Sequence, residues 1–93
     1  MTPLHSNQDV INSAMAAFQA LLNQQVFSPQ IPIPMEAMKI IVRDWIEFYI
    51  SYFAPKLRGD RQERERAQED LWETLQAIAR PFLDKYRDFL NAQ

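Results

Sequence analysis

The sequence offers few side chains that could carry out catalysis together. Its one histidine, His5, stands near the N-terminus with no second candidate ligand beside it, and the chain has no cysteine. A nucleophile, base and orienting group built around histidine or a thiolate is therefore excluded. The single glycine, Gly59, also excludes a phosphate-cradling loop rich in glycine.

Carboxylates at three- or four-residue spacing are the remaining candidates for acid–base or metal chemistry. The pairs are Glu69 with Glu73, Asp84 with Asp88, and Asp44 with Glu47. A two-metal site in a helical bundle requires inward-facing Glu-x-x-His pairs, which this chain does not have. Because these carboxylates fall opposite the apolar stripes of their helices, we expect them in solvent, with no metal, no cofactor and no enzymatic activity.

Two tryptophans could stack on bases or on a cofactor. Trp45 and Trp72 both fall on apolar stripes at helical spacing. Tryptophan in that setting usually belongs to the hydrophobic core, where its large ring contributes packing. We therefore predict a structural role for both.

Length and composition place the chain among small globular domains. Its 93 residues predict a single domain, 1–93, with 47% hydrophobic residues and a net charge of −2. No apolar run reaches the ~18 residues of a membrane span, and residues 1–10 lack the basic and apolar regions of a signal peptide. With no cysteine to form disulfides, we expect a cytoplasmic protein that uses no membrane.

Apolar periodicity of three and four residues predicts an all-α fold with helices at about 7–26, 35–54 and 60–91. Ser6 and Asp9 suit the start of the first helix, and Asp60 with Glu63 suits the start of the third. Residues 1–6 are then an N-terminal tail, and residues 27–34 are a proline-rich connector. The Pro-x-x-Pro spacing of Pro29 and Pro32 could also be a peptide ligand, but a stiff connector is the prediction.

The third predicted helix is unusually long and contains Pro81. Its apolar stripe stays in phase across this proline, which predicts one helix kinked there, with a break into two helices as the alternative. About 32 residues would span ~48 Å, against ~30 Å for the second helix. A compact monomeric bundle has no obvious use for that overhang, so we expect dimerisation to complete the fold.

A sharp contrast between neighbouring segments points to a contact surface. Residues 46–53 are largely aromatic or aliphatic, whereas residues 56–70 carry ten charges. Arginine stems, the first helix or a second chain could cover the rings, and we expect the first helix to cover part of them and an intermolecular contact the rest. The residues predicted for this contact are Phe48, Tyr49, Ile50, Tyr52 and Phe53, with Arg61 and Arg64 at the rim.

These features favour a non-enzymatic protein–protein interaction module: an adaptor, regulator or inhibitor that presents helical surface to a protein partner and forms a homodimer. Residues 10–35 contain no charged side chain, so they can pack against another protein without desolvating a charge.

The alternative is a helical nucleic-acid-binding regulator. It would use the basic residues Lys56, Arg58, Arg61, Arg64 and Arg66. The same block holds five acidic residues, so its charges cancel and nucleic acid is disfavoured. A protein that binds membranes or apolar ligands ranks third, because no basic amphipathic face is present.

Overall fold

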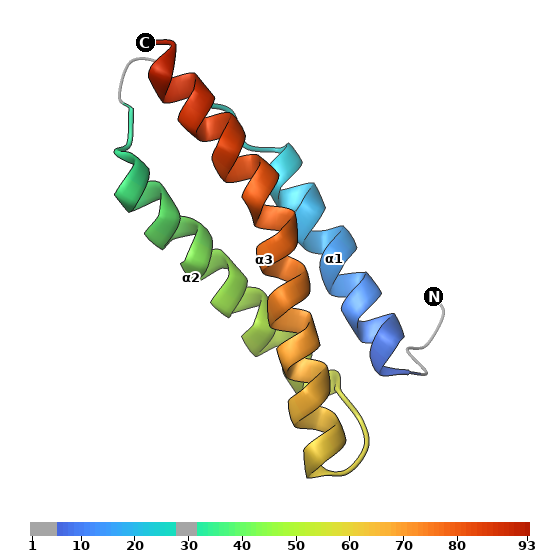
Figure 1. The fold of residues 1–93 in the computed structure, drawn as a ribbon. Coiled ribbons are helices and arrows are strands. Elements are labelled where there is room, and N and C mark those ends of the chain that lie inside the picture. The colour runs from blue at the N-terminus through green and yellow to red at the C-terminus, as the bar shows by residue number, and fades with distance from the viewer. Residues whose placement is uncertain (1–5, 28–31) are drawn as a thin grey trace.

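The computed structural model describes residues 6–27 and 32–93, and over those residues the chain is an antiparallel bundle of three helices (Figure 1). The elements are α1 (Asn7–Asn23), α2 (Met35–Phe53), a short 3-10 turn (Ala54–Lys56) and α3 (Arg61–Asn91). α1 and α3 run in one direction and α2 runs back between them in sequence. The all-α prediction is confirmed. His5 and Pro29 lie outside the described residues.

Helix starts follow from local capping. The Ser6 hydroxyl accepts a hydrogen bond from the Asp9 backbone N–H at 3.1 Å, and the Asp9 carboxylate accepts from the Ser6 N–H at 3.2 Å. At the start of α3, the Asp60 carboxylate accepts from the Glu63 N–H at 2.8 Å. These bonds satisfy backbone donors that have no partner within the helix, and they confirm both predicted caps.

α1 ends at Asn23, three residues before the predicted end. The prediction extended the helix because Val26 falls on its apolar stripe. In the structure Val26 is 91% exposed, whereas the next residue, Phe27, turns onto α3. Burial of Phe27 against α3 therefore outweighs continuation of the helix.

α3 is one helix of 31 residues with Pro81 inside it, so the predicted alternative of two helices is excluded. Phe27 and Ile33, two described residues of the connector, lie against the C-terminal part of this helix. The Phe27 ring lies 5.5 Å from Phe82 and 4.9 Å from Tyr86, and the Tyr86 hydroxyl donates a hydrogen bond to the Ile33 carbonyl. The same chain therefore covers that end of α3, whereas residues 61–66 at its other end are exposed, and completion of the fold by a dimer stays a prediction.

All three helices contribute to one core. Its most completely buried large side chains are Val10, Phe18, Val42, Leu71 and Leu75. At the opposite end from the connector, the Asn7 side chain bonds both backbone groups of Arg58, donating to its carbonyl at 2.9 Å and accepting from its N–H at 2.7 Å. This pair of bonds ties the start of α1 to the loop between α2 and α3.

Candidate protein-interaction surface

Tyr49 joins α2 to α1. Its ring meets Phe18 of α1 edge to face, with centroids 5.5 Å apart, and its hydroxyl lies 3.5 Å from the Ala17 carbonyl, to which it donates. A hydrogen bond of this length is weak, so the ring packing carries most of the contact. The first helix therefore covers part of the aromatic segment, as the sequence predicts.

Two rings next to Tyr49 remain in solvent. Phe48 is 68% exposed and Tyr52 is 59% exposed. The Phe48 ring packs edge to face on Tyr49 at 5.9 Å, and the Tyr52 ring packs in the same way on Phe53 at 4.9 Å. We call Phe48, Tyr49 and Tyr52 the aromatic face. Exposed rings braced by buried ones are the kind of anchor that protein partners use, because little side-chain entropy is lost on contact.

A cation lies over the aromatic face, but it is not one that the sequence indicated. The Lys56 ammonium sits 4.7 Å from the centroid of the Tyr52 ring. Arginine stems from the third helix were one of the three coverings that the sequence left open. The turn after α2 brings the neighbouring lysine over the ring instead, because Pro55 and the 3-10 turn fold the chain back.

Beyond Asp9 in its first turn, the side of α1 next to α2 carries no charge. The bond from Tyr49 places Ala17 beside α2. Ser13, Ala20 and Gln24 follow at three- and four-residue spacing, so they share that side of the helix, and Ala20 and Gln24 are exposed. Together with the aromatic face they form what we call the α1–α2 surface. Of the residues named here, only Lys56, over the Tyr52 ring, would bring a charge into contact with a partner that covers this surface.

The other predicted contact residues lie elsewhere. Phe53 is only 8% exposed and belongs to the core, which corrects its assignment as a contact residue. Ile50 is half-buried and faces α3 beside Trp72. Arg61 and Arg64 are exposed at the start of α3, where Arg61 pairs with Glu65 at 2.9 Å. They line a shallow pocket with Ile50 on the α3 side of α2, and so do not rim the aromatic face.

The predicted contact residues of α2 are divided between the core, the α3 side and the exposed aromatic face because the apolar arc of α2 is wide. Its residues spread over more than half of the helix, and α1 and α3 each cover only one flank. Phe53 and Ile46 become core, whereas Phe48 and Tyr52 are left over. The contact of Lys56 with the Tyr52 ring was not predicted, and only the position of Lys56 just after the aromatic segment could have indicated it.

The structure shows no concentrated basic or catalytic site in the described part of the chain. The five basic residues at the start of α3 and before it are exposed and alternate with carboxylates. Among residues 6–27 and 32–93, no group of three or more histidines or carboxylates is placed to hold a metal ion.

The Trp45 ring packs against the Phe82 ring with centroids 6.2 Å apart, in agreement with a structural role. No helix of the described segments is long and apolar enough to cross a membrane.

Comparison with known proteins agrees with a binding role. The family model for alpha-haemoglobin stabilising protein matches residues 5–92. Human alpha-hemoglobin-stabilizing protein is 42% identical over 99% of this chain and 89% of its own length. The bovine protein of the same name is 40% identical over 99% of both chains, and the mouse protein is 37% identical over 100% of this chain and 90% of its own. These relatives are named for stabilising another protein, which supports the non-enzymatic, protein-binding prediction.

Proposed function

This chain belongs to the alpha-haemoglobin stabilising protein family, and from that premise we propose that it binds and stabilises an alpha-haemoglobin chain through the α1–α2 surface. The observation that carries the proposal is the pair of exposed rings, Phe48 at 68% and Tyr52 at 59%. They stand beside an uncharged helix side and are held by rings beneath them. A globin chain is built of helices, and a helical surface with exposed rings and few charges fits such a partner.

The rings supply enough contact to matter. An aromatic side chain buries roughly 150–250 Å², so the exposed part of each ring offers about 100–140 Å² to a partner. At about 25 cal/mol per Å², that is about 3 kcal/mol per ring before the costs of association. A partner that binds only the folded globin raises the free energy of globin unfolding by mass action, which is how a small protein without catalytic groups can stabilise another.

Among the roles predicted from the sequence, this proposal favours that of a regulator by stabilisation over an inhibitor. A cytoplasmic site of action is consistent with the absence of cysteine from the chain. The stabilising role and the cytoplasmic location are both parts of the proposal.

The proposal is tested by the solubility of isolated alpha-haemoglobin. We expect an equimolar amount of this chain to slow the growth of turbidity in a heated solution of purified alpha-haemoglobin. The Phe48→Ala, Tyr52→Ala double variant should lose that protection while keeping its helical circular dichroism. The matched control is Ile40→Ala, since Ile40 is 62% exposed on the polar side of α2. Equal protection by the double variant and the native chain would reject the α1–α2 surface.

Self-association remains a prediction from the sequence and would use the same two rings. If the chain forms a homodimer through Phe48 and Tyr52, the dimer and the globin complex exclude each other. Light scattering on a sizing column, over a range of concentrations, distinguishes 11.0 kDa from twice that mass. A dimer that persists in the double variant would place self-association on another surface.

A further inference from the structure

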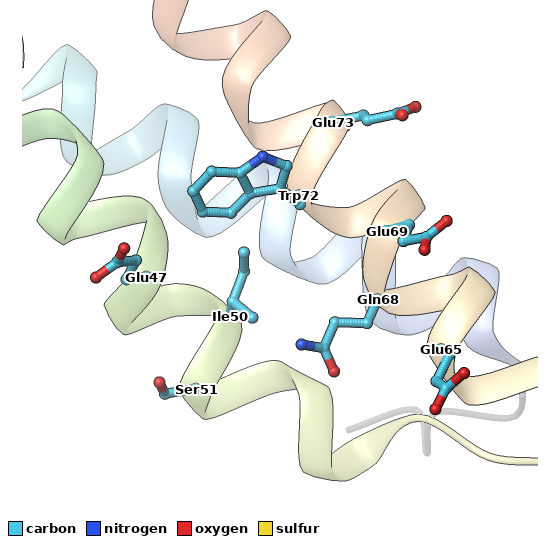
Figure 2. A pocket seen from close by; sticks show the side chains of 8 residues that line it. All are labelled: Glu47, Ile50, Ser51, Glu65, Gln68, Glu69, Trp72 and Glu73. Carbon is cyan, nitrogen blue, oxygen red and sulfur yellow. The ribbon is translucent and has the colours of Figure 1, made fainter. Parts of the chain in front are cut away.

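A groove of about 710 Å³ runs between α2 and α3, on the flank of α2 that faces away from α1 (Figure 2). Ile50 of α2 and Trp72 of α3 are half-buried and lie between the two helices. Ser51 and Gln68 add hydroxyl and amide groups to the lining. The groove therefore has an apolar floor with an indole ring that is partly open to solvent.

Carboxylates stand on both margins of this groove. The glutamates that line it are Glu47 on α2 and Glu65, Glu69 and Glu73 on α3. No lysine or arginine is among the lining residues. An apolar floor between acidic margins is complementary to a segment that carries both apolar and basic side chains.

The cations nearby only partly offset this charge. Arg43 pairs with Glu47 at 3.3 Å and Arg61 with Glu65 at 2.9 Å, and both pairs are largely exposed. Exposed pairs of this kind are weak and exchange readily for other partners. In the part of the chain that the structure describes, Glu69 and Glu73 have no ion pair. Glu69 and Glu73 can therefore pair with a cation of a partner. Glu47 and Glu65 can do so by exchanging or sharing their present arginines.

The spacing of the glutamates indicates the shape of the occupant. Glu65, Glu69 and Glu73 follow one another at four-residue intervals, so they form a row about 12 Å long on α3. A second helix with lysine or arginine at four-residue intervals matches this row. Its adjoining apolar residues would then reach Ile50, and a cation could lie over the Trp72 ring.

We propose that this groove, which we call the α2–α3 groove, docks a basic amphipathic helix of a second protein partner. It is distinct from the α1–α2 surface, because the Tyr49 ring packs on Phe18 of α1 whereas Ile50 lies on the α3 side of α2 beside Trp72. The two surfaces leave room for two partners at once. A protein that binds two partners at once acts as an adaptor, one of the roles predicted from the sequence. The proposal for the α2–α3 groove does not depend on which partner binds the aromatic face.

The test uses a synthetic helical peptide of about 15 residues, blocked at both ends, with lysines at four-residue spacing and leucines on the adjoining side. Its affinity for the whole chain is measured by anisotropy of a labelled peptide at low salt. Binding should shift the indole N–H resonance of Trp72 and leave that of Trp45 in place. A peptide with glutamate in place of each lysine should not bind.

Matched variants separate the groove from net charge. Glu69→Gln with Glu73→Gln should weaken peptide binding about tenfold. Glu36→Gln with Asp88→Asn makes the same change in net charge outside the groove and should alter it less than about twofold. Equal losses in both pairs, no binding of the basic peptide, or a resonance shift at Trp45 instead of Trp72 would each overturn the proposal.

A variant of the aromatic face keeps this proposal separate from the proposed function. Phe48→Ala with Tyr52→Ala should bind the peptide as the native chain does, whatever its effect on alpha-haemoglobin. Loss of peptide binding in that variant would mean that the two surfaces are one site, which would also overturn the proposal.

Discussion

Phe27 packs on the C-terminal part of α3, and its removal should destabilise the fold although its ring is only half-buried. Its ring lies within 5.5 Å of the rings of Phe82, Tyr86 and Phe89. Each such pair contributes about 0.5–1.5 kcal/mol beyond the apolar area that it buries. Because the ring is only partly buried, we expect Phe27→Ala to lower the free energy of unfolding by about 2–3 kcal/mol. The matched control is Val26→Ala, since Val26 is 91% exposed and should change stability by less than about 0.5 kcal/mol.

Urea unfolding followed by circular dichroism measures both variants under the same conditions. For a domain of this size, about 4–8 °C of Tm accompanies each kcal/mol, so thermal unfolding should show a drop of about 10–20 °C for Phe27→Ala. Equal stability of the two variants would contradict a stabilising role for Phe27. It would mean that the contacts of Phe27 with Phe82, Tyr86 and Phe89 do not stabilise the C-terminal part of α3.

Two further substitutions test the ends of the bundle. Tyr86→Phe removes the hydrogen bond to the Ile33 carbonyl and should cost about 1 kcal/mol in urea unfolding without loss of helix content, whereas an unchanged midpoint would show that the bond contributes nothing. Asn7→Ala removes both side-chain hydrogen bonds to the Arg58 backbone and should lower the free energy of unfolding by about 1–2 kcal/mol. The same change at the exposed Asn12 is the control and should cost less. Faster hydrogen exchange at the Arg58 N–H would show that the effect lies at this contact.

The helices could be predicted from sequence because their signals are local. Capping residues and apolar periodicity act within one or two turns, so Ser6 and Asp60 set the starts of α1 and α3 within a residue of the prediction. Pro81 did not break α3, because the apolar stripe on both sides of it is buried against the other helices. Tertiary packing outweighs the loss of one backbone bond there.

The composition of the candidate surface could be predicted only in part, because it depends on where distant segments pack. α2 carries more apolar residues than two neighbours can cover, and its sequence does not say which will be left over. Packing of α1 against Tyr49 and of α3 against Ile50 leaves Phe48 and Tyr52 in solvent and buries Phe53. Register along the helix alone could not make that distinction.

The role of the connector was also beyond local reasoning. Phe27 is one aromatic residue at the start of a proline-rich segment, and nothing near it in sequence indicates a partner. Its contacts are with residues more than fifty positions away. Such long-range pairings decide whether a long helix is covered by its own chain or by another.

The affinity of this chain for purified alpha-haemoglobin is the decisive measurement. It is made by isothermal titration for the native chain, for Phe48→Ala with Tyr52→Ala, and for Ile40→Ala. We expect tight one-to-one binding that weakens more than a hundredfold in the double variant, because each of the two rings offers about 3 kcal/mol before the costs of association, and by less than about threefold in the control. Undiminished binding by a folded double variant would contradict the assignment of the aromatic face. Failure of the native chain to bind would contradict the proposed function itself.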